Sequence, residues 1–110
     1  MEDQHDIEQD WKLFRNRIHG WQEAYMNKLN KEYAALLAGE GKASDKFWAL
    51  EERLRKDRES PGVIVEMRRS KLLWNLSELL KEGVISKEDL TGFSDGTLKA
   101  LNESCGRNLE

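Results

Sequence analysis

This sequence of 110 residues contains a single proline, a single cysteine and few adjacent β-branched residues. A sheet protein is therefore not expected, because strands are rich in valine, isoleucine and threonine. Cys105 cannot close a disulfide within the chain, so packing has to hold the fold, as in proteins of the reducing cytoplasm. No apolar run of 18 residues is present and residues 1–10 are acidic, which argues against a membrane-spanning helix and a secretory signal. We expect a cytoplasmic protein that does not enter the membrane.

Charge is also close to balanced, with 21 acidic and 18 basic residues and a net charge of -3. No overall positive field would draw such a chain to nucleic acid or to acidic lipid. Hydrophobic residues make up 38% of the sequence and charged residues 35%, a balance that suits amphipathic helices with one wet face. The length suits one domain, so we expect residues 1–110 to form a single all-α domain.

The N-terminal third carries large apolar residues at steps of three and four, which is the spacing of one helix face. This pattern predicts a long helix over about residues 6–38, ending at Gly39. Gly20 lies inside it, where glycine costs about 1 kcal/mol relative to alanine, so a bend or a close helix contact is expected there. The apolar positions are Trp11, Phe14, Ile18, Trp21, Tyr25, Leu29, Tyr33 and Leu36.

Two further helices are predicted in the middle of the chain. The first covers about residues 45–58, after a glycine-containing linker. Ser60 followed by Pro61 is typical of a helix cap and first helical position, so the next helix should cover about residues 61–82 and end at Gly83.

Short helices are predicted at the C-terminal end, over about residues 87–91 and 95–104, and Ser86 with Asp89 has the spacing of a capping box. The sequence thus indicates an elongated helical bundle of four to five helices built on the long N-terminal helix. Seven apolar side chains are expected to be largely buried: Phe14, Ile18, Trp21, Leu50, Leu72, Leu76 and Leu79.

One local charge cluster stands out. Seven bases fall within residues 53–71 and form a candidate anion patch if the second and third helices lie side by side. A nucleic-acid-associated regulatory protein, using this corner or a weak helix-turn-helix pattern over residues 85–101, is therefore the alternative hypothesis; a solvated corner is favoured. The bases are Arg53, Arg55, Lys56, Arg58, Arg68, Arg69 and Lys71.

Motifs for catalysis or cofactor binding are not apparent. His19 and Glu23 have ligand spacing on one helix face, but two ligands do not make a zinc site. The linker at residues 39–44 lacks the spacing and the preceding strand of a phosphate loop. We expect a non-enzymatic protein without metal or cofactor.

Self-association is suggested by the length of the first helix. A helix of about 33 residues measures about 50 Å, whereas a compact domain of this size is about 34 Å across. The second and third helices could cover the apolar face end to end in an elongated monomer. We expect instead a homodimer, and so a protein-protein interaction module with an unknown protein partner. The candidate interface comprises Trp11, Phe14, Ile18, Trp21 and Tyr25.

Overall fold

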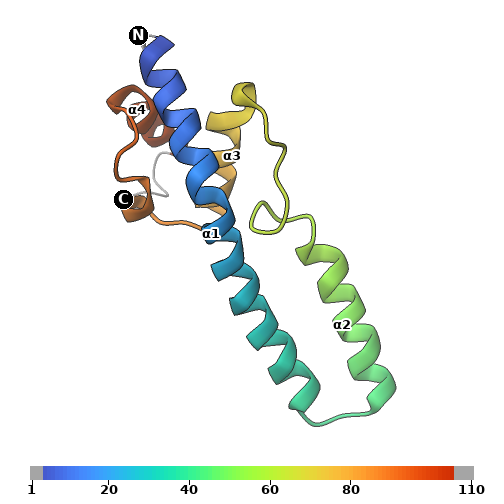
Figure 1. Cartoon of the computed structure of the whole chain (residues 1–110). Coiled ribbons are helices and arrows are strands. Elements are labelled where there is room, and N and C mark those ends of the chain that lie inside the picture. Colours follow the sequence, from blue (N-terminus) through green and yellow to red (C-terminus); the bar gives the residue numbers. More distant parts are fainter. Residues whose placement is uncertain (1–3, 106–110) are drawn as a thin grey trace.

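The computed structural model describes residues 4–105, and within that range it is helical without any strand. The fold class expected from the sequence, all-α and built on a long first helix, is confirmed. Four α-helices are accompanied by two short 3-10 helices, which are marked η (Figure 1). The elements are α1 (Gln4–Ala38), α2 (Ala43–Asp57), η1 (Arg69–Lys71), α3 (Leu72–Lys81), η2 (Lys87–Leu90) and α4 (Asp95–Cys105).

The molecule is elongated, with extents of 57 × 26 × 18 Å and a radius of gyration of 16.9 Å, against about 13 Å for a compact chain of this length. The molecule has two parts, and helix α1 runs through both of them (Figure 1). We call residues 22–58 the hairpin, in which α2 lies antiparallel to the second half of α1. We call residues 4–21 with residues 69–105 the head. Two sets of elements thus cover α1 end to end, which is the elongated arrangement that the sequence also permitted.

The hydrophobic core lies in the head. Phe14 and Ile18 of α1 are buried against Leu76 and Leu79 of α3, and Leu101 of α4 closes the cluster. Of the seven side chains expected to be buried, Trp21 and Leu50 are only half-buried, while the other five are buried. The buried core residues are Trp11, Phe14, Ile18, Leu72, Leu76, Leu79, Ile85, Leu90, Phe93 and Leu101.

The prediction of a helix over residues 61–82 is wrong in its first half. Ser60 does not cap a helix; its carbonyl accepts the N–H of Val63 at 2.9 Å, and its hydroxyl accepts the N–H of Gly62 at 3.1 Å, within a turn. Residues 64–68 then have no regular structure, and the α-helix begins at Leu72. Three consecutive β-branched residues at 63–65 disfavour helix, so the chain extends from the end of α2 to the head.

Other local signals act as expected. Gly83 ends α3 with a φ of 74°, and the N–H of Val84 donates to the carbonyl of Leu79 at 2.9 Å, as in a Schellman motif. The Ser86 N–H donates to Asp89 Oδ2 at 2.8 Å and forms the predicted capping box. Helix α1 is continuous through Gly20, where a Cβ would meet nothing within 4 Å, so no close helix contact exists there.

Candidate functional site on the helical hairpin

Polar contacts hold the two helices of the hairpin together along one side. The Tyr33 hydroxyl of α1 donates to Asp57 Oδ2 of α2 at 2.6 Å. Arg53 of α2 bridges this carboxylate, at 3.3 Å, and Glu32 of α1, at 2.7 Å. Burial, followed by the hydrogen bond to Asp57, raises the pKa of Tyr33 to about 12, so this phenol stays neutral and remains a donor. The hairpin is therefore a defined pair of helices that presents a fixed surface.

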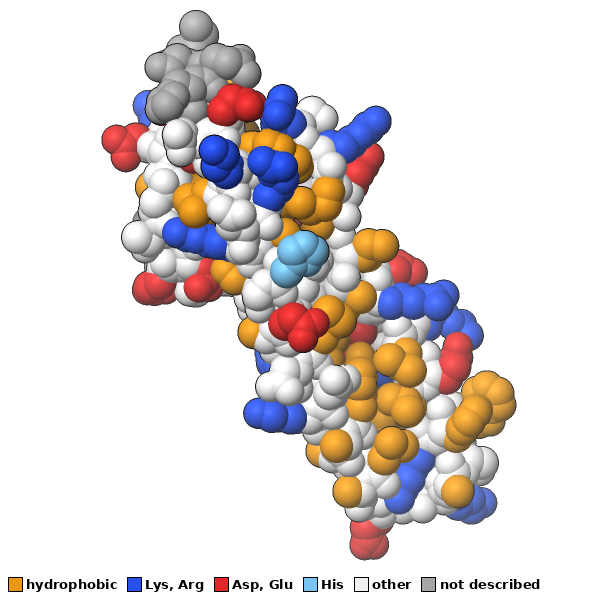
Figure 2. All heavy atoms as spheres, in the orientation of Figure 1, with side chains coloured by type: hydrophobic (Ala, Val, Ile, Leu, Met, Phe, Trp, Pro, Cys, Tyr) orange, Lys and Arg blue, Asp and Glu red, His pale blue; other side chains and the backbone are white. Residues whose placement is uncertain are grey.

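Apolar side chains are also exposed on the hairpin. Phe47 and Trp48 of α2 are each 63% exposed, and Leu37 and Leu54 are nearly half exposed. Figure 2 shows hydrophobic side chains gathered over the half of the molecule where α1 and α2 run side by side. A pair of helices has too few neighbours to cover its own apolar positions, whereas α1 in the head is enclosed by α3 and α4.

A shallow groove runs between the two helices. It has a volume of about 170 Å³ and is lined by residues of α1, of α2 and of the segment that follows α2. Phe47 lies seven residues before Leu54, so the two side chains share this side of α2. Leu37 follows Tyr33 by four residues and extends the wall along α1 by one turn. The groove is lined by Met26, Leu29, Asn30, Tyr33, Leu54, Asp57, Arg58 and Val63.

The exposed aromatic pair is itself ordered by a ring contact. The centroids of Phe47 and Trp48 lie 4.9 Å apart with an interplanar angle of 84°, which is the edge-to-face arrangement that aromatic rings prefer. The sequence did not by itself single out either ring as exposed. The spacing of the two rings could have indicated this exposure. Adjacent residues such as 47 and 48 point about 100° apart around a helix, so the apolar side chains of α2 cover a wide part of its circumference.

The candidate interface from the sequence lies mostly elsewhere. Trp11, Phe14 and Ile18 are buried in the core of the head, with Phe14 and Ile18 almost inaccessible to solvent. These three side chains therefore pack within the chain itself. Trp21 and Tyr25 are half-buried, the former against the core and the latter beside Gly62.

The seven bases of residues 53–71 do not converge as the anion-patch hypothesis requires. Helices α2 and α3 do not lie side by side, because the extended residues 64–68 separate them (Figure 1). The four bases of residues 53–58 therefore lie on the hairpin, Arg68 lies at the end of the extended segment, and Arg69 and Lys71 lie on the head. Four of the seven are also paired with carboxylates: Arg53 with Glu32 and Asp57, Arg55 with Glu51, Arg68 with Glu66, and Arg69 with Glu8.

The structure also differs from the helix-turn-helix pattern of residues 85–101. Its first element, η2, is a 3-10 helix of four residues, too short to act as a supporting helix. Its second element, α4, is docked by Asp10 of α1, which is only 1% exposed. The Asp10 carboxylate accepts the Ser94 N–H at 2.9 Å, the Ser94 hydroxyl at 2.7 Å and the Thr97 hydroxyl at 2.6 Å. This buried acid is thus engaged in attaching α4 to α1.

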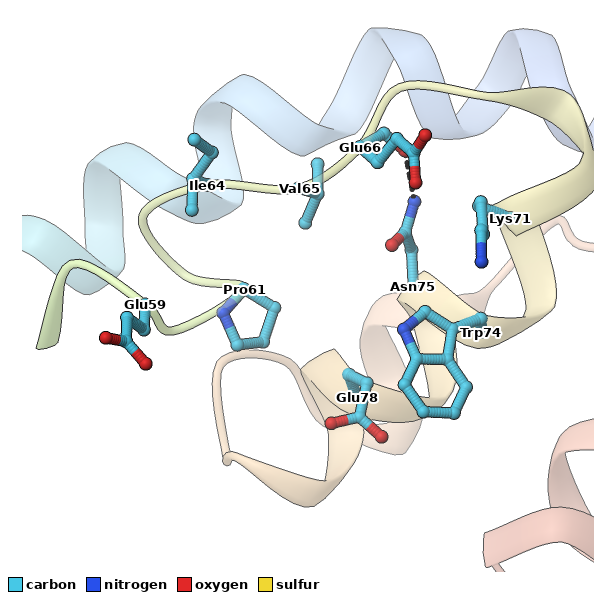
Figure 3. A pocket seen from close by; sticks show the side chains of 9 residues that line it. All are labelled: Glu59, Pro61, Ile64, Val65, Glu66, Lys71, Trp74, Asn75 and Glu78. Carbon is cyan, nitrogen blue, oxygen red and sulfur yellow. Dashed lines mark hydrogen bonds between the residues drawn. The ribbon is translucent and has the colours of Figure 1, made fainter. Parts of the chain in front are cut away.

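A small notch between the segment that follows α2 and helix α3 contains three acids and an exposed indole (Figure 3). Trp74 of α3 is 60% exposed, and the Asn75 amide donates to the Glu66 carbonyl at 2.9 Å, which fixes the extended segment beside α3. The volume of about 200 Å³ lies below the roughly 300–1,000 Å³ of small-molecule sites. The notch is lined by Glu59, Pro61, Ile64, Val65, Glu66, Lys71, Trp74, Asn75 and Glu78.

His19 and Glu23, the pair with metal-ligand spacing, are both exposed. Residues 4–105 contain no group of three or more His, Cys, Asp or Glu residues placed to hold a metal ion. The side chains of His5 and Cys105 lie outside the described set. None of the helices described is both long and apolar enough to cross a bilayer.

No protein-family model, curated protein sequence or solved structure matches this chain. The most distinctive surface of the described residues is the apolar face of the hairpin, where Phe47 and Trp48 are exposed.

Proposed function

We propose that this chain is a non-enzymatic protein-protein interaction module that self-associates through the hairpin, using the second half of α1 together with α2. The observation that carries the proposal is the exposure of Phe47 and Trp48 beside Leu37 and Leu54 on a two-helix element. Exposed apolar patches beyond a few hundred Å² are uncommon on monomers, and tryptophan is enriched at the centres of interfaces.

The size of the aromatic surface supports this proposal. Aromatic side chains bury about 150–250 Å² when fully covered, so Phe47 and Trp48 at 63% exposure each present about 100–150 Å² to solvent. Covering both rings would contribute about 5–8 kcal/mol per copy at 25 cal/mol per Å², before the costs of association. For two copies the contribution is about 10–16 kcal/mol, to be set against association costs of about 4–15 kcal/mol.

Sedimentation equilibrium of the purified chain tests self-association. We expect the mean mass to rise towards that of a dimer within the micromolar range, and a mass that stays monomeric up to about 100 μM would overturn the proposal. The double variant Phe47→Ala, Trp48→Ala should dissociate at concentrations where the wild type is dimeric. Trp74→Ala is the matched control, because this indole is 60% exposed on the head and lies outside the hairpin.

The nucleic-acid hypothesis receives less support, since carboxylates pair with four of its seven bases. Binding to duplex DNA that weakens steeply with salt would favour it over the interaction module. We expect the module to act in the cytoplasm, where the single cysteine of the chain would stay reduced.

A further inference from the structure

The charges of α2 are divided between its two halves. Residues 43–52 contain three acids and one base, whereas residues 53–58, up to the end of the helix, contain four bases and one acid. The helix dipole favours this polarity only within the first and last turns, and Glu51 and Glu52 lie near the middle of α2. The segment of α1 that pairs with α2, residues 22–38, carries two acids and two bases, so the polarity belongs to α2.

The polarity extends to the row of side chains beside the groove. Phe47, Glu51, Leu54 and Arg58 follow one another at steps of four, three and four, and therefore lie along one side of α2. We call these four residues the α2 row. Leu54 and Arg58 line the groove, and Phe47 continues the apolar surface towards the tip of the hairpin. The row presents an aromatic ring, an acid that also pairs with Arg55 of its own helix at 2.7 Å, a leucine and a base, in that order.

A surface with an acid on one side of a leucine and a base on the other is complementary to the same surface of a second copy that runs antiparallel to it. If Glu51 of one copy faces Arg58 of a second copy, a two-fold axis falls beside Leu54, and the same pair forms again on the other side of the axis. Phe47 of each copy is then carried towards the end of the other copy's α2, where Val63 lines the groove.

We propose that a second copy of this chain occupies the hairpin face in antiparallel two-fold orientation, with α2 against α2, Leu54 at the axis and Glu51 opposite Arg58. This inference rests on the proposed self-association and adds its geometry. Figure 1 shows the head and the tip of the hairpin at opposite ends of the chain. An antiparallel pairing of the hairpins would therefore place the two heads on opposite sides of the two-fold axis. A parallel pairing would set Glu51 against Glu51 and Arg58 against Arg58.

Charge exchange at the two positions tests the orientation. Glu51→Lys or Arg58→Glu alone should weaken the dimer about tenfold, because each substitution turns two symmetry-related attractive pairs into repulsive ones. The double variant Glu51→Lys, Arg58→Glu restores both pairs and should dimerise within about threefold of the wild type. Glu103→Lys is the matched control, since it makes the same charge change at an exposed position of α4, outside the hairpin, and should leave the affinity within about threefold.

Mixing the double variant with isotopically labelled wild type completes the test. In an antiparallel mixed dimer, the lysine introduced at position 51 of the variant would face Arg58 of the wild type, so native mass spectrometry should show the two homodimers and few mixed dimers. Abundant mixed dimers, or a double variant that stays as weak as the single ones with the wild-type helix content by circular dichroism, would overturn the antiparallel geometry alone. A wild type that is monomeric up to about 100 μM would overturn self-association and the geometry together.

Discussion

The Asp10 carboxylate of α1 accepts a hydrogen bond of 2.6 Å from the hydroxyl of Thr97 in α4, across 87 positions of sequence. The same carboxylate accepts the N–H and the hydroxyl of Ser94, which precedes the first residue of α4. An acid from one helix thus meets the positive N-terminal end of another, where anions are stabilised. The head is held together by this polar contact as well as by its apolar core.

Replacing Asp10 should destabilise the head strongly. In Asp10→Ala the Thr97 hydroxyl and the Ser94 N–H lose a buried acceptor, and leaving such groups unsatisfied should cost about 2–4 kcal/mol of unfolding free energy. Urea denaturation followed by circular dichroism measures the loss. Glu103→Ala, an exposed acid on α4, is the control and should stay within about 0.5 kcal/mol. Equal losses at the two sites would show that the buried contact is not stabilising.

Two glycines should respond to alanine in opposite directions. A Cβ at Gly62 would overlap the ring of Tyr25, so Gly62→Ala should cost about 1–3 kcal/mol as the turn after α2 moves away from α1. A Cβ at Gly20 would meet nothing within 4 Å in the middle of α1, so Gly20→Ala should stabilise the protein by about 0.5–1 kcal/mol. Thermal and urea unfolding of both variants check the two signs, and a stabilised Gly62→Ala would contradict the packing of Tyr25.

The ionisation of Tyr33 should be delayed in the folded protein. Its pKa is raised from 10.0 to about 12 by burial and by the hydrogen bond to Asp57, so folding favours the neutral phenol. The corresponding stabilisation is fully present below pH 10 and is lost as the pH rises from about 10 to about 12. The difference between the phenolate absorbance titrations of the wild type and Tyr33→Phe should have its midpoint near pH 12.

The variant Asp57→Asn supplies the control for that titration. It removes the negative charge that opposes the phenolate, so the midpoint of Tyr33 should fall part of the way towards 10, while the burial of the ring persists. A wild-type midpoint close to 10 would mean that the contact between Tyr33 and Asp57 is not maintained in solution.

The capping box at Ser86 should contribute measurably to stability. Asp89 accepts the Ser86 N–H at 2.8 Å and the Ser86 hydroxyl at 3.2 Å, so Asp89→Ala leaves the start of η2 without this partner. We expect Ser86→Ala and Asp89→Ala each to cost about 1 kcal/mol in chemical denaturation. Lys87→Ala, an exposed neighbour within η2, should change stability by less than about 0.5 kcal/mol. Losses below about 0.3 kcal/mol at both cap positions would contradict this assignment.

The sequence alone predicts the elements that depend on nearby residues. Apolar steps of three and four indicated α1, Gly83 the end of α3, and Ser86 with Asp89 the start of η2, because helix periodicity and caps act over a few positions. The same local logic failed at Pro61. A Ser-Pro pair favours the start of a helix, but the β-branched residues 63–65 and the packing of Gly62 against Tyr25 favour a turn followed by an extended segment.

Tertiary structure decided which aromatic residues are covered. Phe14 and Phe47 both occupy apolar helical positions, yet Phe14 is buried and Phe47 is 63% exposed. Periodicity shows that a helix has an apolar face but not how many neighbours that face receives. The extended segment after α2 carries α3 and α4 to the N-terminal half of α1, so that half is enclosed while α2 alone packs against the other. The apolar face of the hairpin is exposed because two helices by themselves cannot cover all of their apolar positions.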